Sequence, residues 1–116
     1  MSDLFSVSSE RAGDGLGIVA LSGEVDIYTA PQFKECMLEL LDAGVDRLVV
    51  DLSGVTFIDS TALGVLIGGV RRVHSADGAM ALVVTSRAVE RVLSITGLDR
   101  VFTIHATRAA ALESLA

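Results

Sequence analysis

Hydrophobic and polar positions along this chain switch between the two-residue period of strands and the longer period of helices. Phe5 and Val7 alternate with polar neighbours, a glycine-rich turn follows at residues 12–15, and residues 16–21 form a second apolar run. Two short runs joined in this way predict an antiparallel hairpin. Residues 22–26 are mostly polar, and we expect them to form a loop that carries two carboxylates.

The segment that follows has a strong helix-start signal. Thr29 and Gln32 can each accept a hydrogen bond from the other's backbone N–H group, and Pro31 is tolerated in the first turn. Apolar residues then recur at helical spacing up to Gly44, which favours the left-handed conformation that ends helices. The pattern predicts three further helices, which start at Ser60, near Val89 and after Thr107.

Short runs rich in β-branched residues separate these helices. Arg47–Leu52 reads as a strand buried on both faces, and a turn at residues 53–54 leads to another strand over Val55–Ile58. Two more strands are expected over Met80–Val84 and Val101–Ile104. The order predicts one α/β domain over residues 1–116, with an N-terminal hairpin, a mixed, mostly parallel sheet and about four covering helices.

The carboxyl ends of parallel strands are where such sheets tend to hold ligands and partners. Here that rule selects the loop at residues 23–26 and the junction Ile58-Asp59-Ser60. We therefore look for function at these two places.

Composition narrows the classes of partner. The formal charge is −6 and the pI is near 4.7, a balance that repels phosphate backbones and anionic lipid. The longest apolar run, residues 62–70, is far shorter than the roughly 20 residues that span a bilayer. We expect neither nucleic-acid binding nor membrane insertion.

Targeting and redox features favour the cytoplasm. The start Met1-Ser2-Asp3 lacks the basic region of a signal peptide. Cys36 is the single cysteine, so no disulfide can form within the chain. One cysteine and two histidines far apart in the sequence do not make a set of metal ligands. We expect a cytoplasmic protein that holds no metal or cofactor.

The junction Asp59-Ser60-Thr61 carries the most suggestive chemistry. Helix capping explains one or two of these residues, because the free N–H groups of a first turn need acceptors. It does not explain Gly64 and Gly68, which lie inside the predicted helix at a cost of roughly 1 kcal/mol each relative to alanine. The two glycines either allow another surface to approach closely or pack tightly against the protein's own sheet.

Two motifs about 35 residues apart resemble the bacterial anti-sigma-factor antagonists of the STAS domain family. They are Gly23-Glu24-Val25-Asp26-Ile27-Tyr28-Thr29-Ala30-Pro31 and Phe57-Ile58-Asp59-Ser60-Thr61-Ala62-Leu63-Gly64-Val65-Leu66. The segment Ile95-Thr96-Gly97-Leu98 looks similar too, so the resemblance covers essentially the whole chain. Ala62 departs from the pattern, since relatives often have glycine there, but the change in size is small.

The resemblance implies a partner-switching cycle without catalysis by this chain. The unmodified protein would bind an anti-sigma factor that is also a serine kinase and so release the sigma factor. That kinase, with its own bound ATP and Mg²⁺, would phosphorylate Ser60 and end the binding, and a serine phosphatase would reset it. The resemblance aligns the family's loop aspartate with Asp26, near the kinase contact, and we expect Tyr28, Asp59, Thr61, Gly64 and Gly68 in the same interface.

Three other functions are considered. A serine hydrolase needs a base near Ser60, but His74 lies about 21 Å along the same helix at 1.5 Å per residue, and no G-x-S-x-G motif is present. A phosphoacceptor receiver domain needs a late lysine, whereas the single lysine is Lys34. An unphosphorylated STAS scaffold subunit of a lipid transporter or stress-sensing complex stays open as the alternative.

Overall fold

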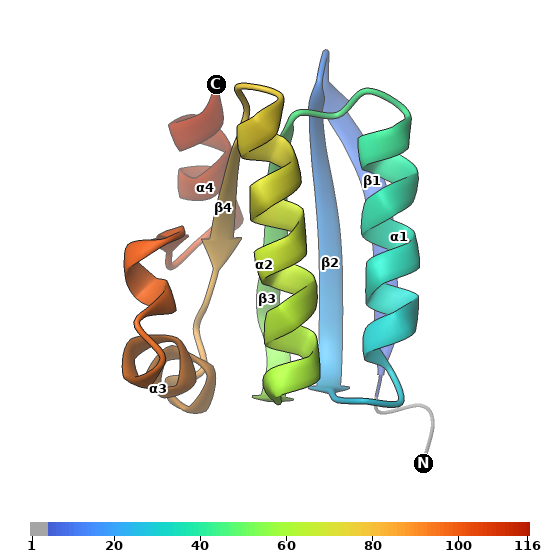
Figure 1. Ribbon diagram of the computed structural model, residues 1–116. Helices are drawn as coiled ribbons and strands as arrows, with labels where there is room; N and C mark the ends of the chain where they lie inside the picture. Colours follow the sequence, from blue (N-terminus) through green and yellow to red (C-terminus); the bar gives the residue numbers. More distant parts are fainter. Residues whose placement is uncertain (1–4) are drawn as a thin grey trace.

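The structure, a computed structural model, describes residues 5–116, so the expectation for Met1–Asp3 lies outside it. Five strands form one sheet in the order β1-β2-β3-β4-β5 (Figure 1). The pair β1–β2 is antiparallel, and all other neighbours are parallel. The predicted hairpin and mixed, mostly parallel sheet are confirmed. The strands are β1 (Ser6–Gly13), β2 (Leu16–Val25), β3 (Arg47–Ile58), β4 (Ala79–Val83) and β5 (Thr103–His105).

Within residues 5–116, four α-helices cover the sheet, as predicted. They are α1 (Ala30–Asp42), α2 (Ser60–Ser75), α3 (Arg87–Ile95) and α4 (Arg108–Leu115). In Figure 1, α1 and α2 run parallel over one face, α3 lies beside the lower half of β3, and α4 packs behind. Because the strand order follows the chain order, successive right-handed crossovers place α1 and α2 on the same face.

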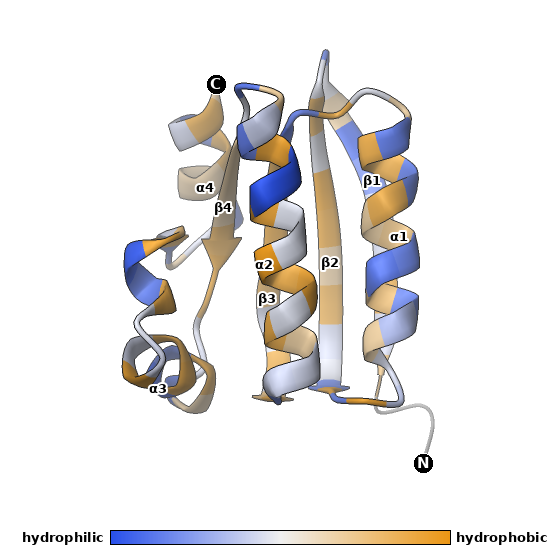
Figure 2. Ribbon diagram, in the orientation of Figure 1, coloured by the Kyte–Doolittle hydropathy of each residue, from blue (hydrophilic) through white to orange (hydrophobic). Residues whose placement is uncertain are grey.

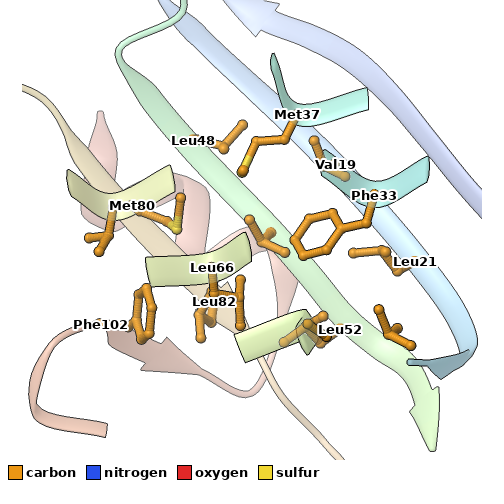
Figure 3. Close-up of a cluster of buried hydrophobic side chains, with 14 of the residues drawn as sticks. Val19, Leu21, Phe33, Met37, Leu48, Leu52, Leu66, Met80, Leu82 and Phe102 are labelled. Atoms are coloured by element: carbon orange, nitrogen blue, oxygen red, sulfur yellow. The ribbon is translucent and has the colours of Figure 1, made fainter. Parts of the chain in front are cut away.

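The main core lies between the sheet and the helices α1, α2 and α3. Phe33 and Met37 of α1 and Leu66 of α2 are fully buried against the strands (Figure 3). A smaller apolar cluster under α4 joins Ala111 and Leu115 to the opposite face of the sheet. In Figure 2, β2 and β4 are apolar along much of their length, α1 alternates between hydrophilic and hydrophobic bands, and α2 is mostly neutral or hydrophobic apart from one hydrophilic stretch.

Two predictions about the strands were wrong. Residues 22–25 belong to β2 instead of a loop, and β3 runs unbroken through the turn expected at Ser53-Gly54. Gly54 does not have the positive φ of a tight turn. A Cβ at Gly54 would lie 2.8 Å from the Ser22 Cβ, so this glycine allows β2 and β3 to approach closely. The pairing register shifts beside it, as in a β-bulge.

The predicted cap of α1 was also wrong in its contacts. Thr29 is the N-cap residue, but its side chain makes no capping hydrogen bond to the helix. Its hydroxyl donates to the Glu24 carbonyl (3.0 Å) and accepts from the Asp26 N–H group (2.9 Å). The last strand begins two residues later than expected, because Val101 and Phe102 complete a bend after the 3-10 helix Leu98–Arg100.

An ion pair between a half-exposed arginine and a buried aspartate ties α4 to the sheet. Arg108 contacts the Asp51 carboxylate at 2.9 Å, and Asp51 is only 6% exposed. Burial raises the pKa of Asp51, but hydrogen bonds from Ser53 and the charge of Arg108 together outweigh that effect and lower the pKa below its ordinary value of 3.8. The carboxylate is therefore charged at neutral pH and anchors Arg108.

Candidate functional site

The carboxyl ends of β2 and β3 bring the two predicted functional segments together. Val25 and Ile58 are paired as the last residues of their strands, and the Asp59 N–H group donates to the Val25 carbonyl (3.2 Å). The β2–α1 loop and the start of α2 therefore lie side by side at the lower edge of the sheet (Figure 1). We call the surface formed by residues 26–28 and 59–61 the switch edge.

At the start of α2, the three junction residues have different surroundings. Asp59 is the N-cap, and its carboxylate accepts a hydrogen bond from the Ala62 N–H group (3.0 Å). Asp59 is half-buried, whereas Ser60 and Thr61 are exposed. Capping thus accounts for Asp59 alone, and it leaves both hydroxyl side chains facing solvent on the first turn.

Asp26 organises the loop that enters α1. One of its carboxylate oxygens accepts hydrogen bonds from the N–H groups of Tyr28 (2.9 Å) and Thr29 (3.2 Å). Asp26 is half-buried and its carboxylate fixes the loop, so it has a structural function in addition to the partner contact expected from the sequence. As a result, Ile27 and Tyr28 are held outward, with exposed fractions of 60% and 84%.

A third large apolar side chain is exposed near the same edge. Phe57 is 49% exposed, and both Thr56 and Phe57 face outward between the buried Val55 and Ile58. This break in alternation coincides with a register shift between β2 and β3 at Gly23 and Glu24. The bulge turns Phe57 out of the core and exposes it close to the end of β3.

Gly64 and Gly68 lie on the outer side of α2 and are exposed. A Cβ placed on either would meet no atom within 4 Å. Tight packing against the sheet, one of the two explanations that the sequence allowed, is therefore excluded for both. Gly69 is the glycine that packs inward, since its Cβ would lie 2.6 Å from the Met37 sulfur.

The bare side of α2 forms one wall of a groove of about 570 Å³ between α1 and α2. This α1–α2 groove begins at Thr61, next to the switch edge, and extends along both helices. Residues from both helices line it, among them Pro31, Lys34, Leu38, Thr61, Gly64 and Gly68.

The seven predicted site residues lie in one region of the surface, and two of them, Asp26 and Asp59, also fix the local backbone. Asp26, Tyr28, Asp59, Ser60 and Thr61 meet at the switch edge, and Gly64 and Gly68 continue it along α2. Sequence reasoning missed Ile27, Phe57 and the rim residue Lys34. The apolar pair Ile27-Tyr28 between a strand and a helix start was an available signal, but the outward turn of Phe57 depends on a bulge that the sequence pattern does not show.

Neither histidine can activate Ser60 as a nucleophile. His74 lies near the opposite end of α2. His105 is level with Val83 and Asp51 across the sheet. Ile58 is seven residues further along β3, or about 23 Å at 3.3 Å per residue. A hydrolytic Ser–His arrangement is therefore excluded at this site.

No helix within residues 5–116 has the length and apolar character needed to cross a bilayer.

Comparisons with known proteins agree on one family. Residues 9–111 match the family model described as the STAS domain. The anti-sigma-B factor antagonist of Bacillus subtilis is 36% identical over 88 residues, which is 76% of this chain and 80% of that protein.

Solved structures give the same result. An anti-sigma factor antagonist from Mycobacterium paratuberculosis is 30% identical with a TM-score of 0.88, and the match covers 99% of this chain and 97% of the other. The unphosphorylated anti-sigma factor antagonist SpoIIAA has a TM-score of 0.82 over 94% of this chain and 95% of its own. At 21% identity, that second likeness shows the shared fold alone.

Proposed function

This chain belongs to the STAS domain family and is related to its anti-sigma factor antagonists, and on that basis we propose a phosphorylation switch at Ser60. The unphosphorylated protein binds an anti-sigma factor that is also a serine kinase, and the sigma factor is released. When that kinase phosphorylates Ser60, the complex dissociates. A serine phosphatase then restores the binding form in the cytoplasm.

The observation that carries the proposal is the exposed Ser60 hydroxyl at the first residue of α2. A kinase can reach this oxygen without unfolding the helix. In the transfer step, the Ser60 Oγ attacks the γ-phosphorus of ATP, ADP leaves, and the hydroxyl proton passes to a base of the kinase. This chain contributes only the acceptor, while ATP and Mg²⁺ are bound by the kinase.

The fold tolerates the added phosphate for an electrostatic reason. Unpaired N–H groups and the helix dipole make the N-terminus of α2 favourable for an anion. A phosphoserine carries about −1.5 to −2 charges at neutral pH. It would therefore leave the core intact while changing the charge of the surface.

The size of the added phosphate opposes a partner that fits the unmodified serine. Asp59 and Asp26 already place two carboxylates at the switch edge, and the whole chain has a net charge of −6. A surface complementary to these acids and to an uncharged hydroxyl would meet extra bulk where Ser60 docks. Binding would weaken without a change in the backbone of this protein.

Exposed apolar groups beside Ser60 supply the contact area. Ile27 and Tyr28 are exposed on the neighbouring β2–α1 loop, and aromatic residues are over-represented among side chains that dominate binding energies. Asp26 acts mainly as a positioning residue, because it holds the loop that presents Tyr28. Gly64 and Gly68 keep the adjoining helix surface low enough for close approach.

Affinity capture with Ser60 variants tests the switch. Wild-type protein and Ser60→Ala should capture the kinase from native lysate. Ser60→Asp should capture an amount of kinase that is lower by about tenfold or more. Ser9→Asp, which adds the same charge at an exposed position of β1, is the matched control and should behave as wild type. Mass spectrometry after incubation with the captured kinase and ATP should place phosphate on Ser60.

The proposal fails if Ser60→Asp and wild-type protein bind the kinase equally well. Capture of a complex without any kinase, in which Ser60 stays unmodified, would favour the scaffold role instead.

A further inference from the structure

The α1–α2 groove is long enough to hold a segment of another protein. Its lining positions on α2 run from Thr61 to Arg72 at intervals of three and four residues, which is one side of a helix. At 1.5 Å per residue, that stretch is about 16 Å, or three helical turns. The groove is lined mostly by apolar atoms and opens beside the switch edge.

The free protein gains nothing from the hollow shape of this groove. Gly64 and Gly68 are poor helix formers, and neither packs against another part of the chain. Alanine at either position would favour the helix and meet no steric obstacle. The hollow therefore serves contact with something outside the chain.

The charges on the rim indicate the chemistry of the occupant. Arg72 forms an ion pair with Asp42 (2.6 Å) at the upper end of the groove. Lys34 lies on the α1 side, and within residues 5–116 it forms no ion pair. A carboxylate on an incoming segment would pair with this cation, which stands out in a chain of net charge −6.

We propose that the α1–α2 groove binds an amphipathic helix of the partner kinase. Its apolar side chains would lie over Gly64 and Gly68, and an acidic residue would pair with Lys34. Two parallel helices separated by a groove accept a third helix by ridge-into-groove packing, and the glycines permit close approach. This inference rests on the proposed function, and it extends the kinase contact from Ser60 along α2.

A groove-filling variant tests the inference against the purified kinase identified by the Ser60 capture. Gly68→Leu projects a side chain into the groove, whereas Ala109→Leu adds the same side chain at an exposed position of α4. Calorimetric titration should show kinase affinity about tenfold weaker or more for Gly68→Leu and unchanged for Ala109→Leu. Thermal unfolding of Gly68→Leu should occur at or above the wild-type temperature.

The charge is tested separately. Lys34→Glu should weaken kinase binding by about tenfold, and replacing the opposing acidic residue of the kinase with lysine should restore it. If no single acidic residue of the kinase rescues Lys34→Glu, the assignment of Lys34 is wrong.

Failure of the groove and failure of the switch give different results. If Gly68→Leu binds the kinase as tightly as wild type, the groove inference is overturned while the Ser60 proposal stands. If wild-type protein captures no kinase at all, the proposed function itself fails. If wild-type protein self-associates in sedimentation experiments and Gly68→Leu does not, the occupant is a second copy of this chain and the inference is likewise overturned.

Discussion

Replacing Gly68 with alanine should stabilise the free protein. Gly68 lies in the interior of α2, has an ordinary helical backbone and is exposed. An added Cβ meets no atom within 4 Å, so no steric penalty offsets the better helix propensity of alanine. Glycine also leaves the unfolded chain more freedom to lose on folding than alanine does.

The expected gain follows from these two facts. Glycine costs about 0.8–1.0 kcal/mol relative to alanine inside a helix. At about 2.1 cal/mol/K per residue, unfolding of this chain has an entropy near 240 cal/mol/K around 60 °C. A gain of about 1 kcal/mol should therefore raise the Tm by about 4 °C.

Urea denaturation followed by circular dichroism measures this change, with thermal unfolding as a second assay. The neighbouring residue supplies a matched control. A Cβ on Gly69 would lie 2.6 Å from the Met37 sulfur and 2.8 Å from the Met80 methyl carbon, so Gly69→Ala should lower stability or leave it unimproved. A loss of stability in Gly68→Ala, or an equal gain in both variants, would refute the conclusion that Gly68 faces open space.

Two further predictions concern the carboxylates. Asp26→Ala removes the acceptor for the N–H groups of Tyr28 and Thr29 and should lower the free energy of unfolding by about 1 kcal/mol. Asp26→Asn keeps an acceptor oxygen and should lower it by less. Equal losses for the two variants in denaturation experiments would show that the charge of Asp26, and not the loop hydrogen bonds, supports the fold. Asp51→Asn should destabilise the protein at pH 7 by about 1–3 kcal/mol, because the Arg108 guanidinium loses its buried charged partner and keeps only the exposed Glu10 carboxylate. The folded pKa of Asp51 lies below the ordinary 3.8, so wild-type stabilisation is complete above that value and is lost as the pH falls through the lower folded pKa. The stability difference between wild type and Asp51→Asn should therefore shrink below about pH 3.8, and a difference that stays constant through that range in pH-dependent denaturation would contradict the role of the ion pair.

Local sequence signals predicted the elements and their order. The start of α2 at Ser60 follows from a capping residue before an apolar helical stripe, and these signals act over only a few residues. Gly44 was predicted as a helix end, and it has the positive φ that favours glycine. The alternation of strands with helices was enough to predict a mostly parallel sheet.

Contacts between distant segments decided what the pattern did not show. Gly54 looked like a turn residue because its nearest contact, Ser22, belongs to a strand 32 residues earlier. Phe57 was predicted only as part of a short strand, and the bulge between β2 and β3 decided that it faces solvent.

The same distinction between local sequence signals and contacts of distant segments applies to the functional surface. Ser60 and Asp59 could be selected from the sequence because a strand-to-helix junction has a recognisable pattern and resembles a known family. The choice between inward packing and open space at Gly64 and Gly68 depended on which side of α2 faces the sheet. A helical repeat fixes which residues share a side, but only packing against α1 and the sheet determines that this side is left open as a groove beside Lys34.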